Sequence, residues 1–159
     1  MESKKDSPGV YIPPPLYYVL IFLIALFMQK KVSINDAVFC LQITRITGIL
    51  LLVISFFLLV TSLRKFLQSK NTLMLIRPAS SLQTNGIYNI SRNPMYVGLA
   101  MVYLGITCFI GNWWNIILFP ILLLIIQEYI IKREEKYLGR RFAQEYFNYK
   151  SKVRRWLWL

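Results

Sequence analysis

The stretch SRNPMYVG, Ser91 to Gly98, places an arginine, an asparagine and a proline directly before an apolar run of membrane length. Proline suits the first turn of a helix because it has no amide hydrogen to leave unpaired, and the side-chain oxygen of Asn93 can accept from the next free amides. Such a helix start offers amides and a positive dipole end to a carboxylate or another polar ligand. With Tyr88 just upstream, the stretch is either a ligand site or a well-capped helix entry with an interfacial tyrosine.

A second group of polar residues follows a later apolar run, in the stretch QEYIIKREEKYLGRRF. Helical spacing places six of them on two adjoining faces: Glu128, Lys132 and Glu135 on one, and Gln127, Glu134 and Arg141 on the other. Glu128 stands out because its neighbours in sequence are mostly apolar, and a carboxylate at membrane depth is usually functional or paired. It therefore has either a role in a site or a surface pair with Lys132.

The residue types give little support to metal or redox chemistry. The chain has no histidine, which is the commonest metal ligand and general base. Its two cysteines, Cys40 and Cys108, lie in apolar stretches without ligand spacing, and we interpret them as packing residues. We therefore expect no metal site.

Composition indicates which elements must position these residues. Of 159 residues, 56% are hydrophobic and only 16% are charged, which is more apolar surface than one small soluble core can bury. The net charge of +12 would otherwise suggest nucleic acid as a partner, but the basic residues lie between the apolar runs and in the tail, where membrane proteins meet anionic headgroups. We predict an all-α, polytopic membrane protein that does not bind nucleic acid.

Four apolar segments approach the roughly 20 residues that a helix needs to cross a bilayer. They are YIPPPLYYVLIFLIALFM near the N-terminus, about residues 43–63, residues 94–110 and residues 113–131. Pro13 to Pro15 begin the first, which we interpret as a retained anchor because no small-residue cleavage site follows it. Only Gly111 and Asn112 separate the last two, which predicts a tight helical hairpin.

Basic residues indicate the topology. With four spans, sixteen lysines and arginines fall on one side and two on the other, so both termini should face the cytoplasm. Arg45, near the start of the second span, either snorkels to the interface or faces a polar cavity. Residues 1–159 are predicted to form a single membrane domain, with the first two spans and the start of a cytoplasmic loop in 1–79 and the remaining helices in 80–159.

The C-terminal stretch is charged, aromatic and compatible with a helix to about Tyr149. Its apolar and aromatic residues recur every three or four positions, as in an amphipathic helix that lies against the interface or the cytoplasmic mouth of the protein. Trp156 and Trp158 lie beside two arginines and are interpreted as anchors at headgroup level.

The stretches LQTNGIYNISRNPMYVG and REEKYLGRRFAQEYFNYKSKVRRWL, separated by one helical hairpin, together resemble the isoprenylcysteine carboxyl methyltransferase and phospholipid methyltransferase family. The resemblance implies an integral membrane enzyme that uses S-adenosylmethionine, bound at the cytoplasmic mouth between the last two spans and the C-terminal helix. By position, it assigns cofactor binding to Ser80, Ser81, Leu82 and Gln83 in a loop, to Tyr88, to the motif Asn93, Pro94, Met95 and Tyr96, and to Glu134. It also gives Arg92 a catalytic role, which we interpret as orienting the cofactor carboxylate or an anionic acceptor.

Three positions depart from the pattern of the family that the chain resembles. Asn93 replaces the usual histidine, and Ala143 stands where a glycine is common. Ile130 occupies the position at which the eukaryotic prenylcysteine enzymes carry an arginine near the substrate carboxylate. The resemblance therefore does not extend to a prenylated protein as substrate.

We expect methyl transfer by in-line displacement to a lipophilic or amphiphilic small molecule, in contact with membrane lipids. The accepting group stays open between a carboxylate, an amine, a thiol and a hydroxyl. Two alternatives remain. One is an NADPH-dependent reductase of the sterol type, which shares an Arg-x-Pro-x-Tyr helix entry, and the other is a non-enzymatic membrane interaction protein whose basic tail binds anionic lipid or a partner.

Overall fold

The computed structural model describes residues 9–68 and 81–157, and every regular element in these ranges is helical. The elements in chain order are α1 (Pro14–Lys31), η1 (Ala37–Cys40), α2 (Gln42–Gln68), η2 (Gly86–Asn89), α3 (Pro94–Ile110), α4 (Trp113–Ile125), η3 (Ile126–Ile131) and α5 (Lys132–Lys152). The all-α prediction is confirmed over the described ranges. The predicted spans agree with the helices to within a few residues, although α2 extends beyond the predicted end to Gln68.

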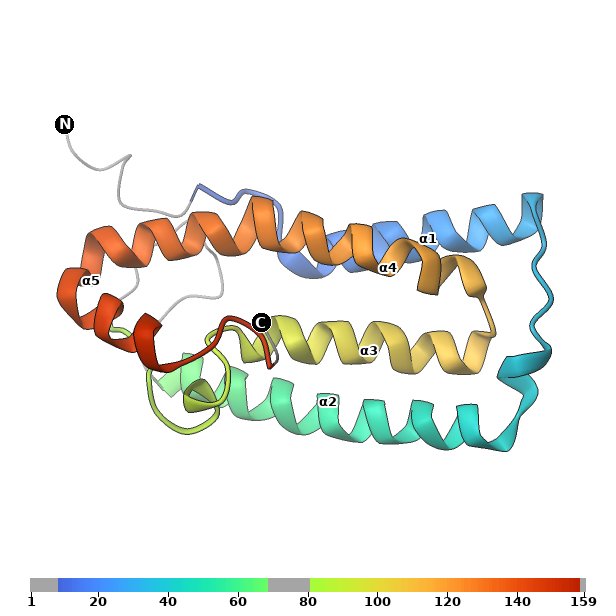
Figure 1. The fold of residues 1–159 in the computed structure, drawn as a ribbon, viewed down its shortest axis with the longest axis horizontal. Coiled ribbons are helices and arrows are strands. Elements are labelled where there is room, and N and C mark those ends of the chain that lie inside the picture. Colours follow the sequence, from blue (N-terminus) through green and yellow to red (C-terminus); the bar gives the residue numbers. More distant parts are fainter. Residues whose placement is uncertain (1–8, 69–80, 158–159) are drawn as a thin grey trace.

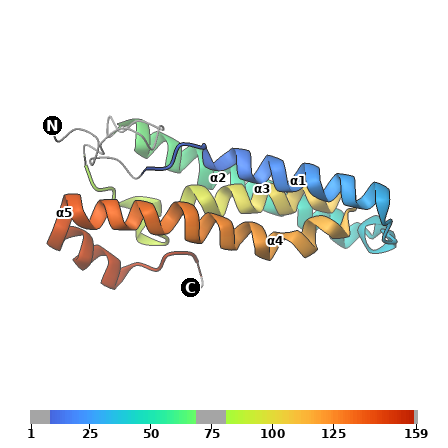
Figure 2. The same ribbon diagram turned by 90° about the horizontal axis from the view of Figure 1, so that it is seen from above.

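Four long helices lie side by side, and α3 contacts each of the other three (Figure 1). The helix α1 lies along α4, while α2 lies along α3. The helix α5 continues α4 beyond the bundle and turns back on itself (Figure 2). The residues after α5 then lie at the start of α3, since the Arg92 backbone amide donates to the Arg154 carbonyl. The start of α3, where the SRNP motif lies, is therefore surrounded by several parts of the chain.

Small residues allow α2 and α3 to approach closely. Gly48 on α2 and Gly105 on α3 face each other, since a Cβ built on either glycine would lie 3.2 Å from the backbone oxygen of the other. A Cβ on Gly105 would also lie 2.8 Å from Cγ of Leu52, closer than real Cβ contacts allow. A second glycine on α3, Gly98, is covered in the same way by Leu59 on α2. Such contacts between small residues are the usual means by which membrane helices pack.

The predicted hairpin between α3 and α4 is confirmed at the other end of the bundle. Gly111 ends α3 with a φ of 70°, in the left-handed region that glycine adopts readily. The Asn112 side chain then accepts from the backbone amide of Trp114 at 2.9 Å and caps α4. The indole of Trp113 donates to the Asn35 carbonyl at 2.9 Å, which ties the turn to the α1–α2 connection.

Two local irregularities shape the long helix that begins at Trp113. The first is η3, a π-helical turn that joins α4 to α5 without a break. The second is a kink in α5 at Ala143, which has a φ of 40°. Residues other than glycine rarely adopt this backbone conformation. Because of the kink, the last part of α5 reverses toward the bundle (Figure 2).

Within the described ranges, two helices are long and apolar enough to cross a membrane, Gln42–Lys65 and the continuous helix Trp113–Lys152, and α3 is a shorter apolar helix. Large apolar side chains on α1 and α2 are exposed on the surface of the protein: Leu16, Val19, Leu20, Leu23, Ile24 and Phe27 on α1, and Ile46, Ile49, Leu50, Val53, Ile54, Phe56 and Phe57 on α2. An apolar surface of this size is typical of contact with lipid. That all four helices cross the bilayer stays a prediction.

The close contact between α2 and α3 predicts that Gly105→Ala destabilises the protein. The new methyl group must displace Leu52 or separate the helices, and overpacking of this kind costs about 1–3 kcal/mol. Thermal unfolding in detergent measures the effect. Gly139→Ala is the matched control, because the nearest heavy atom to its added Cβ is 3.7 Å away. An unchanged midpoint in Gly105→Ala would contradict the tight contact.

Candidate functional site

Tyr96, Glu134 and Tyr88 lie together beside the start of α3. The Tyr96 hydroxyl, in the first turn of α3, donates to Oε1 of Glu134 on α5 at 2.8 Å. The Tyr18 hydroxyl on α1 donates to the Tyr96 carbonyl at 3.1 Å and holds this turn from the other side. Tyr88 lies in η2. Burial, and to a lesser extent the negative charge of Glu134, raises the pKa of its hydroxyl to about 12. Three residues assigned to the cofactor thus meet at one place.

Among the residues that the structure describes, Glu134 has no cationic partner to stabilise the charge of its carboxylate. Burial is the main reason that its pKa is raised to about 7. The negative charge of Glu135 also raises the pKa, while the hydrogen bond from Tyr96 lowers it. No cation contributes to this shift. A buried carboxylate in such surroundings can bind a cation, or share a proton with a polar ligand.

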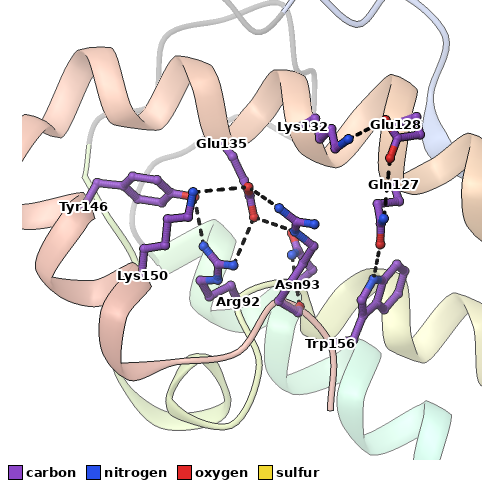
Figure 3. A network of polar contacts seen from close by, with 10 residues as sticks. Arg92, Asn93, Gln127, Glu128, Lys132, Glu135, Tyr146, Lys150 and Trp156 are labelled. Carbon is purple, nitrogen blue, oxygen red and sulfur yellow. Dashed lines mark hydrogen bonds and ion pairs between the residues drawn. The ribbon is translucent and has the colours of Figure 1, made fainter. Parts of the chain in front are cut away.

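Glu135, the next residue, has the opposite environment. Arg155 donates to both of its oxygens, from Nε at 2.9 Å and from Nη2 at 2.7 Å. Arg92 lies 3.3 Å away and Lys150 lies 4.0 Å away. Burial alone would raise the pKa of Glu135, but the Arg155 hydrogen bond and the three positive charges outweigh it, and the pKa lies below its usual value. Figure 3 shows this carboxylate at the centre of the polar network.

Residues 153–156, which we call the C-terminal segment, lie across the entry to α3. The backbone amide of Arg92 donates to the Arg154 carbonyl at 2.9 Å. The Arg155 carbonyl accepts from the Ser91 hydroxyl at 3.0 Å and from Nδ2 of Asn93 at 3.1 Å. These bonds and the ion pairs of Glu135 join the SRNP motif to the end of the chain.

The prediction that the Asn93 side chain caps α3 is wrong, because that side chain makes no capping hydrogen bond. Its amide group donates to the C-terminal segment instead. The amides of Tyr96 and Val97 bond to the backbone oxygen of Asn93, as in any regular first turn. Pro94 begins α3 as predicted, and Asn93 acts as a link between two parts of the chain.

Trp156 is also not the headgroup anchor that the sequence suggested. Its side chain is 3% exposed, and its indole donates to Oε1 of Gln127 at 3.1 Å. Glu135, eight residues after Gln127, binds the neighbouring Arg155. Because residues seven apart share a face of a regular α-helix, the sequence predicted that Glu134 would lie on the same face as Gln127. The π-helical turn between them adds about one residue, so Glu135 takes that face instead of Glu134. Trp158 lies outside the described residues.

The remaining expected residues have varied surroundings. In the upstream loop, Gln83 donates to the Ser81 hydroxyl at 3.0 Å, and Leu82 packs with the aromatic residues of α5. Met95 packs against the main core. Ser80 lies outside the described residues.

The surface-pair interpretation of Glu128 is confirmed. Lys132 donates to its carboxylate at 2.6 Å, and both side chains are about half exposed. Cys40 and Cys108 are free thiols. Within residues 9–68 and 81–157, no group of three potential metal-binding side chains lies close together.

Sequence reasoning did not select Glu135, Arg155 or Tyr146 for the site. The Tyr146 hydroxyl accepts from Nη1 of Arg92 at 3.4 Å. The only available signal was the paired glutamates, because no spacing rule connects Arg92 with a residue more than sixty positions away.

We expect Glu135→Gln to release the C-terminal segment. The Glu135 side chain is 11% exposed and that of its partner Arg92 is 9% exposed. Removing one partner of such a buried ion pair costs about 3 kcal/mol. Limited trypsin digestion should then cleave after Lys150, Lys152 and Arg154 several-fold faster. Glu128→Gln is the control, because a pair that is half exposed contributes less than about 1 kcal/mol. Equal digestion rates in the two variants would contradict the role of Glu135.

Parts of this chain are similar to known proteins. The model of the phospholipid methyltransferase family matches residues 43–145. An uncharacterized protein of Haemophilus influenzae is 44% identical over 66 residues, which cover 40% of this chain and 100% of that protein. The protein-S-isoprenylcysteine O-methyltransferase of Schizosaccharomyces pombe is 38% identical over 72 residues, which cover 45% of this chain but only 30% of the yeast enzyme. No solved structure gives a significant match.

The family match begins at the start of α2 and extends beyond Glu134 and Glu135 on α5. It therefore includes the SRNP motif, Tyr88 and Tyr96. Since the match covers more than half of the residues, the chain belongs to the phospholipid methyltransferase family.

Proposed function

We propose that this protein is an integral membrane methyltransferase that uses S-adenosylmethionine to methylate a lipophilic or amphiphilic acceptor. Family membership and the exposed apolar helices support a membrane enzyme of this class. The observation that carries the proposal is Glu134, whose partly buried carboxylate accepts from Tyr96, lies close enough to Tyr88 to raise the pKa of that tyrosine, and has no cationic partner among the described residues. When bound, S-adenosylmethionine supplies a methyl group that is already activated by a positively charged sulfur.

The residues at the start of α3 suit such a ligand. Glu134 would pair with its positive amine or accept from its ribose hydroxyls, and Tyr88 would offer a flat ring with a polar tip. Tyr96 holds the carboxylate of Glu134 in place. The other residues that we assign to cofactor binding are Ser80, Ser81, Leu82, Gln83, Asn93, Pro94 and Met95.

The mechanism makes modest demands on the protein. An in-line displacement at an activated methyl group requires alignment of the reactants and exclusion of water, so no histidine is needed. Buried Tyr96 and the core residues around it exclude water from the start of α3. We assign Arg92 to orienting an anionic group, because this residue lines a basic pocket and its Nε has no partner in the described part of the chain.

The acceptor is expected to enter from the membrane. Ile130, where a carboxylate-binding arginine stands in the prenylcysteine enzymes that the sequence resembles, is fully buried in the apolar core. A cation at this place would lack solvation. This favours an acceptor recognised by its apolar part over one recognised by a carboxylate at that position.

We further propose that residues 1–159 form one membrane domain with four spans, in which 80–159 bind the cofactor. The distribution of basic residues supports a cytoplasmic location for both termini. The first described residues also lie against the start of α5, since Nη1 of Arg133 donates to the Gly9 carbonyl at 3.2 Å. The helix α5 would then lie at the cytoplasmic surface.

Binding of S-adenosylhomocysteine to the purified protein tests the site. We expect Glu134→Ala and Tyr88→Ala each to weaken binding at least tenfold in calorimetry, because each removes a direct contact. Glu145→Ala and Tyr11→Ala are the controls, since both residues are exposed. Wild-type affinity in both site variants would rule out the site, and stabilisation by NADPH alone would favour the reductase.

The pKa of Glu134 gives a pH dependence for binding of S-adenosylmethionine. Below about pH 7 the carboxylate of the free protein is mostly protonated, and a cationic ligand favours the ionised form. The association constant should therefore rise as the pH increases from 5.5 to about 7, with release of a proton. Glu134→Gln should lose this rise. A wild-type association constant that falls over this range would contradict the assigned role.

A further inference from the structure

A basic pocket of about 440 Å³ lies between the end of α5, the C-terminal segment and the entry to α3. Seven residues line it: Arg92, Lys150, Ser151, Lys152, Val153, Arg154 and Arg155. Of these residues, only Arg92 is also assigned a role in the proposed function, and Tyr88, Tyr96 and Glu134 do not line the pocket.

The charge around this pocket is unbalanced. Five of its seven lining residues are lysine or arginine. Glu135 is shared between three of these cations, and its contacts weaken from Arg155 at 2.7 Å to Arg92 at 3.3 Å and Lys150 at 4.0 Å. One carboxylate cannot neutralise three cations, and Lys152 and Arg154 add two further positive charges to the pocket.

Arg92 lines the pocket and also has an unused hydrogen-bond donor. Its side chain is 9% exposed, its Nη1 donates to Tyr146 and its Nη2 faces Glu135. Its Nε is buried and has no hydrogen-bond partner among the described residues. Buried donors are almost always paired, and a guanidinium edge matches the spacing of two oxygens on a phosphate or carboxylate.

We propose that this pocket is a binding site for a phosphate group. A phosphate carries negative charge on several acceptor oxygens, so it can bind the Arg92 guanidinium and the Lys150 ammonium together and supply the negative charge that Glu135 alone does not. The phosphate comes either from an anionic lipid headgroup or from a free phosphate in solution. The proposal does not depend on methyl transfer.

The test uses the full chain with Lys150→Gln/Lys152→Gln, which removes two exposed pocket cations and leaves Arg92, Glu135 and Arg155 intact. Lys136→Gln/Arg140→Gln is the matched control, because it removes the same charge from exposed positions on the same helix outside the pocket. Protein in neutral detergent is titrated with inorganic phosphate at constant ionic strength, and thermal stabilisation is measured. In parallel, phosphatidylglycerol retained from mixed nanodiscs is quantified by native mass spectrometry, with phosphatidylcholine nanodiscs as reference.

We expect the pocket variant to weaken the response at least fivefold and the control variant to change it less than twofold. A response to phosphatidylglycerol alone assigns the phosphate to a lipid headgroup, and a response to both ligands shows that free phosphate also enters. No wild-type response to either ligand, or an equal loss in both variants, would overturn the proposal. S-adenosylhomocysteine binding, measured separately, should be unchanged in the pocket variant, so failure of one proposal is distinguishable from failure of the other.

Discussion

The Glu135 carboxylate holds together three parts of the chain that the sequence keeps far apart. It is on α5, and it binds Arg92 at the entry to α3 and Arg155 in the C-terminal segment. With Arg155 fixed, the backbone of this segment can accept from Ser91, Arg92 and Asn93. The start of α3 therefore depends on an ion pair as well as on helix packing.

Two adjacent glutamates differ because their surroundings differ. Glu135 is bound by cations, which keep it ionised, while Glu134 is buried against the hydroxyl of Tyr96 and close to a second negative charge. Within the described residues, cations thus satisfy one carboxylate and not the other, which supports the proposed role of Glu134 in ligand binding. The ion pairs of Glu135 fix the part of α5 that also carries Glu134, and a binding residue on a fixed support is expected where binding requires a defined geometry.

Helices could be predicted from the sequence, but their irregularities could not. Apolar runs and the Gly111–Asn112 turn are local signals, so the helix ends agree closely with expectation. The π-helical turn and the positive φ of Ala143 depend on tertiary packing, and regular spacing does not reveal them. The family resemblance was enough to group Tyr88, Tyr96 and Glu134 in one site. Sequence patterns alone predicted a membrane-surface position for Trp156 and gave no role to Arg155.

The helix α3 has 17 residues, which at about 1.5 Å per residue span about 26 Å. The hydrocarbon layer of a bilayer is about 30 Å thick. If the Gly111–Asn112 turn lies at one edge of this layer, the opposite end of α3 begins a few ångströms inside it. The polar residues before α3, Ser91, Arg92 and Asn93, would then lie in a depression below the headgroups. A lipophilic molecule could reach their polar groups there without leaving the lipid.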